Sequence, residues 1–490
     1  MTELPLRADR LRTSVRALDC SHGVAPHPVD LERIGVLLEL SVGLSAWKRY
    51  RSTRWALRCN PSSGNLHPTE GYLVCGRLPG LEPGVHHYVS HDHVLEQRAG
   101  CDREAWSDLF EGGVVLALTS VFWREAWKYG VRAFRYCQHD VGHAIAAVRY
   151  AAAALGWRAK LIDGWGDDDL ARLLGIHRPA DFHGAEHESP DALLWIGPRE
   201  RTVDPEVVLP AMGMPRWFGR ASRLSPKRIE WPPIDEVEKA ARKRRTTFTE
   251  RPTGERPPRA SPSGDMGASR LFRQRRSAVD LDGRTSISKQ AFYTMLDALL
   301  PRRGVAPWDA LPWEPRVHPV FFVHRVEGLR PGLYALPRRP EALPELRAAM
   351  RSELLWERVD GPAAHVDLRL LVPIDCREAA ATIACGQAIA ADGAFAVGML
   401  AEFERSLTEG TWWYRHLHWE AGVLGHVLYL EAERAGVRGT GIGCFFDDTM
   451  HDTLGLSDWS FQTLYHFTVG GPLDDPRLQT EPAYEHLASR

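Results

Sequence analysis

A polar loop at residues 58–72, RCNPSSGNLHPTEGY, stands directly before an apolar segment that predicts a β-strand. Pro61 and Pro68 stiffen the two ends of this loop, and Gly64 permits a tight turn or the close approach of a ligand. Hydrogen-bond donors and acceptors come from Ser62, Ser63 and Asn65. Such a loop could hold a flat polar ring, or it could be a surface turn that its own Ser and Asn side chains stabilise. Its composition leaves both interpretations open.

A second polar cluster lies far along the chain, in the segment LFRQRRSAVDLDG at residues 271–283. Here Arg275, Arg276 and Ser277 are predicted to lie at or near the first turn of a helix. Two guanidinium groups, a hydroxyl and a helix N-terminus together suit a phosphate monoester. Arginine-rich helix starts are also commonly solvated, so this cluster alone does not identify a site.

The charged residues argue against a polyanionic partner. The chain has 61 Lys and Arg against 63 Asp and Glu, a formal net charge of −2, which gives no reason to expect nucleic acid or an anionic membrane surface. The N-terminus lacks the pattern of a signal peptide, and the most apolar helical segment carries Arg149 and is too short to span a bilayer. We therefore expect a cytoplasmic protein with a small or neutral partner.

Metal and disulfide chemistry is not indicated by the cysteines and histidines. His139 and His143 are four residues apart, as metal ligands on a helix can be, but no third ligand is evident, so polar packing is preferred and no metal is predicted. Asp140 is predicted to pair with Arg135 at the start of the same helix. The cysteines are scattered, without a Cys-x-x-Cys spacing, and are predicted to be reduced thiols: Cys20, Cys59, Cys75, Cys101, Cys137, Cys376, Cys385 and Cys444.

The chain is predicted to contain two domains joined by a linker. Residues 221–268 are rich in Pro, Arg, Lys, Glu and Ser and poor in large aliphatic side chains, as is typical of a linker. The flanking domains, 1–220 and 269–490, share three blocks: PGLEPGVHHY matches EGLRPGLYAL, FRYCQHDVGHAIAAVRYAAAALG matches YRHLHWEAGVLGHVLYLEAERAG, and DDDLARLLGI matches DDTMHDTLGL. The last two blocks share one offset of 280 residues (415 − 135 and 447 − 167), which indicates an internal repeat.

Each half shows the same order of predicted elements. An N-terminal helix, a polar loop, a strand and turn, a helix and a second strand precede a long helix, an acidic loop and a last strand. This order indicates an α+β fold without a regular βαβ repeat. The long helices are small and apolar on most faces, which favours burial against a neighbour. We expect the halves to pack through them as a pseudo-dimer within one chain.

These segments resemble the nitroreductase superfamily of flavin enzymes, in particular its SagB-type oxidoreductase branch. The resemblance rests on Arg-x-x-Pro-Ser-Ser-Gly-x-x-x-Pro-x-Glu at residues 58–70, on KYGVRAFRYCQHDVGH, on WYRHLHWEAGVLGHVLYLEA and on GIGCFFDD. It covers both halves and implies two nitroreductase-like domains, each a mixed sheet flanked by helices. It also implies that FMN binds between the two domains, in one composite site.

The resemblance assigns residues of both halves to the flavin. The family often has a third basic residue two places after the phosphate-binding Ser, where this chain has Val279, so that either phosphate affinity is reduced or Arg477 compensates. The second half would supply Arg275, Arg276, Ser277 and Arg477 to the phosphate, Gln387 to the ring edge, and backbone groups of Ile442 and Gly443 near the pyrimidine and N5 side, while the first half would supply Pro61, Ser62, Ser63 and Asn65.

The repeat predicts that only one flavin site survives. The Pro-Gly turns are offset by 332 − 84 = 248, so that loop positions 61–65 fall on 309–313, where PSSGN is replaced by DALPW. Gly443 corresponds to Asp163, which would put a carboxylate where backbone should approach an electron-rich reduced ring. We therefore expect one FMN per chain and one degenerate site.

Lys128 and Tyr129 resemble the Lys-Tyr pair of the azoline dehydrogenases in this branch, where such a pair is assigned acid–base work. A partly buried Lys128 with a lowered pKa could take a proton while hydride leaves to flavin N5. Alternatively, Lys128 lies on the rim of a helix beside a Tyr that packs in the core. The repeat positions are Thr408 and Glu409, so only the half that kept the PSSGN loop has the pair.

The predicted function is thus an FMN-dependent oxidoreductase that transfers hydride to or from flavin N5. Either a C–H bond of a small molecule or modified peptide reduces the flavin, or NAD(P)H does so and a nitro, quinone or enone compound is then reduced. No Gly-x-Gly-x-x-Gly fingerprint is present, so NAD(P)H is not predicted from a motif. The alternative is a non-catalytic flavin-binding module or scaffold, which the degenerate second site and Val279 favour.

Overall fold

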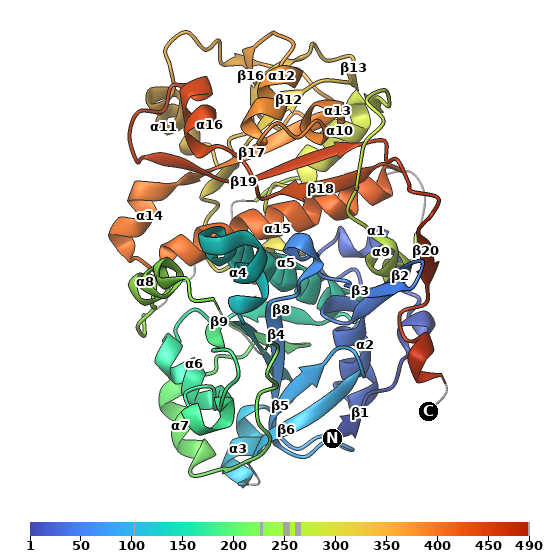
Figure 1. Ribbon diagram of the computed structural model, residues 1–490, viewed down its shortest axis with the longest axis vertical. Helices are drawn as coiled ribbons and strands as arrows, with labels where there is room; N and C mark the ends of the chain where they lie inside the picture. The colour runs from blue at the N-terminus through green and yellow to red at the C-terminus, as the bar shows by residue number, and fades with distance from the viewer. Residues whose placement is uncertain (102, 226–228, 248–254, 260–265, 489–490) are drawn as a thin grey trace.

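The computed structural model describes residues 1–101, 103–225, 229–247, 255–259 and 266–488. Two lobes, each built on a large sheet, lie one above the other with two long helices between them (Figure 1). The prediction of an α+β fold with sheets flanked by helices is confirmed. Among the described residues, no helix is long and apolar enough to cross a membrane.

The first lobe carries an eight-stranded sheet. Its order is β1-β6-β5-β4-β7-β9-β8, with β10 also paired to β6, and Leu116 of β7 stands opposite Leu194 of the antiparallel β9. The strands are β1 (Thr2–Glu3), β4 (Thr69–Cys75), β5 (Gly84–Val89), β6 (Val94–Gly100), β7 (Val114–Ser120), β8 (Arg158–Leu161), β9 (Ser189–Gly197) and β10 (Arg216–Trp217). The helices are α1 (Val15–Leu18), α2 (Leu31–Ser41), α3 (Glu104–Leu109), α4 (Trp123–Tyr129), α5 (Ala133–Ala154), α6 (Asp167–Leu174) and α7 (Pro205–Met212).

The second lobe repeats this arrangement in a seven-stranded sheet ordered β15-β16-β14-β12-β17-β19-β18. Six strands match the path β6-β5-β4-β7-β9-β8 of the first lobe, and Val397 of β17 faces Phe467 of the antiparallel β19. The strands are β12 (Val317–Val323), β14 (Gly332–Ala335), β15 (Glu357–Arg358), β16 (Arg369–Val372), β17 (Phe395–Glu402), β18 (Arg438–Ile442) and β19 (Phe461–Gly470), and β11 (Ile287–Ser288) pairs with β13 (Val326–Glu327). The helices are α9 (Ala268–Gln274), α10 (Lys289–Ala298), α11 (Ala342–Ala349), α12 (Arg377–Ile383), α13 (Ile389–Asp392), α14 (Phe403–Glu409), α15 (Trp413–Arg434) and α16 (Asp447–Leu454).

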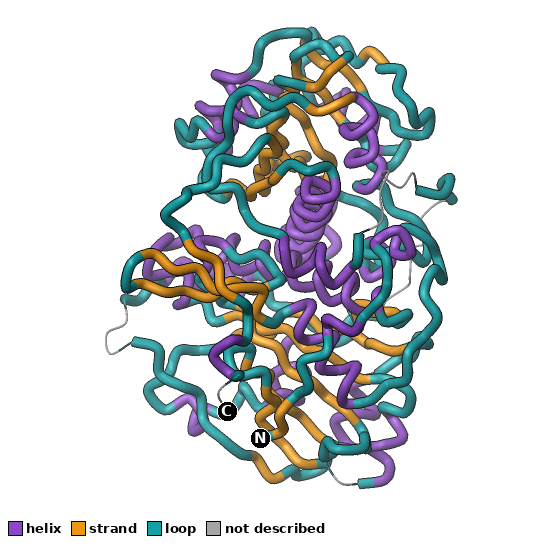
Figure 2. Tube along the Cα trace, turned by 90° about the vertical axis from the view of Figure 1, so that its right-hand side faces the viewer, coloured by secondary structure: helices purple, strands orange, loops and turns teal. Residues whose placement is uncertain are grey.

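Helices α5 and α15, each of 22 residues, cross between the lobes and bury nearly all of their side chains. Gly142 and Gly422, which the repeat offset relates, meet at the crossing. A Cβ atom on Gly142 would lie 2.2 Å from the carbonyl oxygen of Trp419, and one on Gly422 would lie 2.3 Å from that of His139. The two glycines therefore let the helix backbones touch. Figure 2 shows this helical layer between the two sheets.

The end of the chain returns to the first lobe. Strand β20 (Gln479–Glu481) pairs with β2 (Leu44–Tyr50), which pairs with β3 (Thr53–Arg58). Tyr484 accepts a hydrogen bond from the backbone N–H of Leu44 at 2.9 Å, next to the three-stranded sheet. The last residues of the predicted domain 269–490 thus pack on the first lobe. Strand pairing between these distant segments joins the two halves.

Two stretches differ in detail from the predicted pattern. The expected acidic loops are in fact the helices α6 and α16, because carboxylates in the first turn favour a helix N-terminus and each helix ends at a left-handed glycine, Gly175 or Gly455. Within the predicted linker, α8 (Pro232–Ala240) packs Ile234 against side chains of α4 and α5. Residues 226–228, 248–254 and 260–265 of that linker lie outside the described residues.

Candidate functional site

A cavity of about 900 Å³ lies between the two lobes and is hereafter the interlobe cavity. The first half reaches it from β2, β3, the loop after β3, α4 and α5. The second half reaches it from the segment after α9, from β18 and from the chain before β20. The predicted site residues that line it are Pro61, Ser62, Ser63, Asn65, Tyr129, Arg275, Arg276, Ser277, Gln387, Ile442 and Gly443.

The PSSGN loop forms one wall of the interlobe cavity and is held by its own polar groups. It contains a short 3-10 turn, η2 (Ser63–Asn65), with left-handed φ angles of +56° at Gly64 and +59° at Asn65. Ser63 donates its backbone N–H and its hydroxyl to Asp140 of α5, at 3.0 and 3.1 Å. Asn65 Nδ2 donates to the carbonyl of Ala56 at 2.8 Å. These side chains therefore fix the shape of the loop and anchor it to α5.

Asp140 is a buried anchor, and its predicted ion pair with Arg135 is wrong. Arg135 instead binds Asp447 of the second half at 2.7 Å, because residues five apart on a helix do not share a face. Burial raises the pKa of Asp140. Burial and the neighbouring Asp140 also raise the pKa of Glu125, whose carboxylate oxygens have no hydrogen-bond partner among the described residues. Two buried carboxyl groups thus lie behind the loop.

Arg275, Arg276 and Ser277 lie on another wall of the cavity, but not at a helix start. Helix α9 ends at Gln274, and Arg275 has extended dihedral angles of φ −50° and ψ 131°. Ser277 then pairs with Gly439 of β18 in a parallel bridge, which draws the segment out of the helical conformation. The predicted helix start is therefore wrong, although the three residues do line one cavity.

Arg275 is a buried cation, and Arg276 beside it is half-buried. Arg275 is buried, donates to the carbonyl of Arg58 at 3.1 Å and lies 5.0 Å from the ring of Tyr429, while its Nε has no partner among the described residues. Burial lowers the pKa of Arg275. Burial and the charge of Arg275 lower the pKa of Arg276 to about 10. Neighbouring cations that repel each other in this way form a site for an anion.

Lys48 and Arg438 add to this cationic wall and were not identified from the sequence. Burial and the charge of Arg276 lower the pKa of Lys48, whose Nζ donates to Thr480 Oγ1 at 2.7 Å. Arg438 on β18 also lines the cavity and pairs with Asp474 at 2.6 Å. Neither residue belongs to a motif, because strand pairing between distant segments brings both of them to the cavity.

Lys128 and Tyr129 end α4 beside the PSSGN loop. A Cβ atom on Gly64 would lie 2.2 Å from Tyr129 Oη and 3.0 Å from Lys128 Nζ, so both side chains lie against the glycine of the loop. The Tyr129 ring packs edge-to-face on Tyr136, with centroids 4.8 Å apart. Lys128 is exposed, and its expected partial burial is wrong, because α4 turns its buried face away from this position.

Gln387 and the segment after β18 close one end of the cavity. Gln387 Nε2 donates to the carbonyls of Ala384 and Cys444, at 2.7 and 3.1 Å, and so ties the two segments together. Gly443 has no room for a side chain, since a Cβ atom there would lie 2.5 Å from the ring of Tyr136. The packing of Tyr136 therefore requires a glycine at this end of the cavity.

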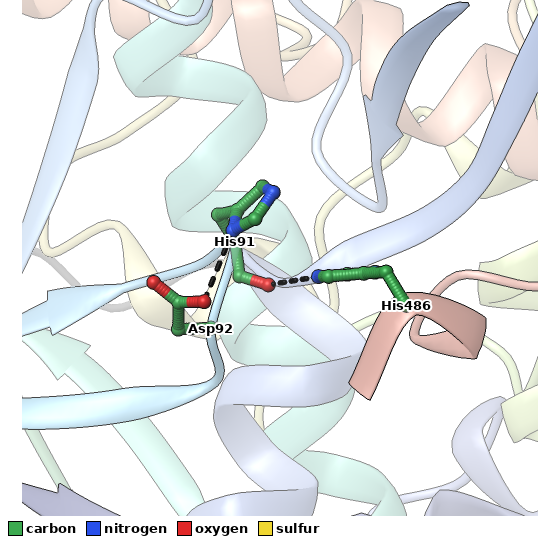
Figure 3. A group of neighbouring side chains, drawn as sticks. All are labelled: His91, Asp92 and His486. Carbon is green, nitrogen blue, oxygen red and sulfur yellow. Dashed lines mark hydrogen bonds and ion pairs between the residues drawn. The ribbon is translucent and has the colours of Figure 1, made fainter. Parts of the chain in front are cut away.

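Two other groups lie outside the residues that line the interlobe cavity. The Arg477 side chain is 69% exposed and pairs with Asp475 at 2.7 Å. In the described part of the chain, His91, Asp92 and His486 have possible metal-ligand atoms within 4.8 Å of one another. Figure 3 shows His486 bonded to the backbone carbonyl of His91, and His91 to Asp92. These contacts attach the C-terminal tail to the first lobe.

A second cavity, of about 730 Å³, occupies the repeat-related place and is hereafter the Asp163 cavity. Asp163 lines it at the position that corresponds to Gly443. Lys243, from the segment after α8, is enclosed at its edge. Its Nζ donates to the carbonyls of Asp163 and Trp165 and to Thr246 Oγ1. Lys243 is thus bonded to three residues that line the cavity.

Comparisons with known proteins agree with this architecture. No family model matches the sequence. A Methanocaldococcus jannaschii protein provisionally named a nitroreductase is 25% identical over 157 residues, which cover 30% of this chain and 76% of that protein. The crystal structure of a protein from Anabaena variabilis, also provisionally named a nitroreductase, matches with a TM-score of 0.67 at 21% identity and covers 95% of this chain and 93% of that one. This chain has the nitroreductase fold. The predicted resemblance to the nitroreductase superfamily is confirmed for the fold, which extends over both lobes.

Proposed function

We propose that the chain is an FMN-dependent oxidoreductase of the SagB-type branch of the nitroreductases, with one flavin in the interlobe cavity. The observation that carries this proposal is that a cationic wall from the second half and the PSSGN loop from the first half meet in one cavity. Its volume of about 900 Å³ is typical of cofactor pockets. The alternative, a non-catalytic flavin-binding or scaffold protein, is favoured by the degenerate repeat-related site and by Val279.

The cationic wall fits the phosphate of FMN. Arg275 has a buried Nε without a partner among the described residues, and Arg276 stands directly beside it. Ser277 adds a hydroxyl, which lies 2.8 Å from Tyr429 Oη. A phosphate dianion would remove the repulsion that lowers the pKa of Arg276, since an opposite charge favours the protonated form. The two basic residues that the sequence did not identify interact with this pair, since Arg276 helps to lower the pKa of Lys48 and Arg438 helps to lower the pKa of Arg276.

The other end of the cavity fits a flat ring system. When bound, FMN supplies hydride acceptance and donation at its N5. Gly443 lines this end together with the ring of Tyr136, which packs against its backbone. Lys128 Nζ and Tyr129 Oη lie against the PSSGN loop at Gly64 and can hold or release a proton at a substrate atom while hydride moves.

The Lys-Tyr pair favours oxidation of a substrate C–H bond, as in azoline dehydrogenases, over reduction by NAD(P)H. We therefore propose a small heterocyclic compound or a modified peptide as substrate, acted on in the cytoplasm. Mixing the FMN-loaded protein without oxygen with NADH, NADPH or azoline-containing peptides separates the possibilities. Bleaching of the flavin by a peptide supports the dehydrogenase, and bleaching by a nicotinamide alone supports the reductase. A purified chain that retains no flavin after reconstitution contradicts the proposal.

A further inference from the structure

A pair of cysteines lies at the edge of the interlobe cavity. Cys444 Sγ is 2.7 Å from Cys385 Sγ, and both residues are free thiols. Cys444 is exposed and lines the cavity, whereas Cys385 is half-buried. Their separation exceeds an S–S bond by about 0.6 Å. A small shift of the two side chains therefore brings the sulfurs to bonding distance.

The backbone around both cysteines is held in place. Gln387 Nε2 donates to the carbonyl of Cys444, which connects the turn after α12 to the loop after β18. Arg132 from the first half donates to the carbonyl of Phe445 at 2.8 Å. Cys385 has a left-handed φ of +58°, which a residue with a side chain adopts where its surroundings fix it. The contact between the thiols is thus supported from both lobes.

We propose that Cys385 and Cys444 form a reversible dithiol–disulfide couple that exchanges with soluble disulfides of the glutathione type. The Cys444 thiolate attacks one sulfur of the soluble disulfide, forms a mixed disulfide and releases one thiolate, which takes up a proton. Cys385 then loses its proton to solvent, attacks Cys444 Sγ and releases the second soluble thiol. Two protein thiols are oxidised to one disulfide, and one soluble disulfide is reduced to two thiols.

The surroundings of the two thiols determine which one reacts first. Burial and the adjoining Cys444 thiol raise the pKa of Cys385, so Cys385 is the poorer nucleophile toward a soluble partner. The exposed Cys444 is the thiol that such a partner reaches. The disulfide would tie the turn that carries Gln387 to the loop that carries Gly443. Its effect on a flavin rests on the proposed function, whereas formation of the bond does not.

Mass spectrometry of the purified full chain, equilibrated in glutathione buffers from reducing to oxidising, tests the couple. Acid quenching and alkylation precede digestion with trypsin, which places each cysteine alone in a peptide, 378–405 or 439–477. We expect these peptides to become cross-linked as the buffer is oxidised, with a mass about 2 Da below the sum of the two thiol peptides. A matched Cys20→Ser variant should cross-link to the same extent.

The variant Cys385→Ser provides the second measurement. It should keep glutathione on Cys444, a gain of about 305 Da, because the resolving thiol is missing. The absence of the cross-link at every buffer ratio in the unaltered chain, with Cys444 either free or only glutathionylated, would overturn the couple. The assay needs no FMN, so its outcome is separate from that of the flavin proposal.

Discussion

The interlobe cavity and the Asp163 cavity occupy related places in the two halves but treat their charges differently. In the interlobe cavity, Arg275 stands beside Arg276 and helps to lower its pKa to about 10. In the Asp163 cavity, Lys243 is enclosed by two carbonyl oxygens and a hydroxyl. Arg245 there bonds Asp169 of α6 at 2.8 Å. Among the described residues, the guanidinium groups of Arg275 and Arg276 donate only to backbone carbonyls, so an anion would stabilise both, whereas Arg245 is already paired with a carboxylate.

The loops beside the two cavities are both bonded to α5, but by groups of opposite charge. Asp140 of α5 accepts two hydrogen bonds from Ser63 and holds the PSSGN loop. In the corresponding segment DALPW, Asp309 itself binds Arg149 of α5 at 2.7 Å. The sizes of the cavities are similar, about 900 and 730 Å³. The proposed cofactor site therefore differs from its degenerate copy in its cations and not in its volume. Arg275 there has a buried Nε without a partner among the described residues.

The variant Gly443→Asp gives the interlobe cavity the residue of its counterpart and should have the largest effect. We expect FMN affinity to fall more than about 100-fold, because the side chain would meet the Tyr136 ring, 2.5 Å from the Cβ position, and bring a carboxylate to the ring end. Titration of flavin fluorescence measures this loss. The matched variant Asp163→Gly should bind FMN as the unaltered chain does. Undiminished binding by Gly443→Asp would show that Gly443 does not lie at the flavin site.

The variant Lys128→Thr places the residue found at repeat position 408 beside the PSSGN loop. If Lys128 does acid–base work, reduction of the flavin by its substrate should slow by about 100-fold or more. Stopped-flow absorbance measures the rate, and FMN affinity reports whether the cavity is intact. Lys239→Thr, an exposed change on α8, is the matched control. Equal rates in the two variants would remove Lys128 from the reaction.

The variant Arg276→Ala tests the cationic wall. Loss of one charge-assisted bond to phosphate should weaken FMN binding by about 1.5–3 kcal/mol, or roughly 10- to 100-fold. Arg477→Ala is the comparison variant. The resemblance predicts that Arg477 binds phosphate, but its side chain is exposed and paired with Asp475. Isothermal titration should show the loss only for Arg276→Ala. A larger loss for Arg477→Ala would move the phosphate site to the chain before β20.

The variant Glu125→Gln should have the smallest effect. Burial and Asp140 raise the pKa of Glu125 in the folded state, and repeat position 405 has an arginine instead. Because the pKa of Glu125 is higher in the folded than in the unfolded chain, its contribution to stability is fully present below the unfolded pKa of about 4.5. That contribution is lost as the pH rises towards the folded pKa. The variant should therefore gain about 1–2 kcal/mol in urea unfolding at pH 8 and almost nothing at pH 4. A gain of the same size at both pH values would show that ionisation of Glu125 does not destabilise the fold. The control is Glu236→Gln, a change at an exposed residue of α8.

The sequence predicted the elements that follow from local periodicity and from the repeat. It did not predict the contacts that depend on pairing between distant segments. The long helices and the strands GGVVLALTSVF and GAFAVGMLAEF follow from periodicity, and α5, α15, β7 and β17 confirm them. The extended segment at Ser277 depends on its bridge to Gly439. Lys48 reaches the cavity because β2 pairs with β20. The contact of Cys385 with Cys444 joins segments that no spacing rule connects.

The number of flavins bound per chain decides whether FMN binds in the interlobe cavity alone. FMN is titrated into the purified chain, and the bound flavin is counted after gel filtration from its absorbance at about 450 nm. We expect one FMN per chain, which Gly443→Asp abolishes and Asp163→Gly leaves at one. Two FMN per chain, or none, would show that the proposal of a single site in the interlobe cavity is wrong.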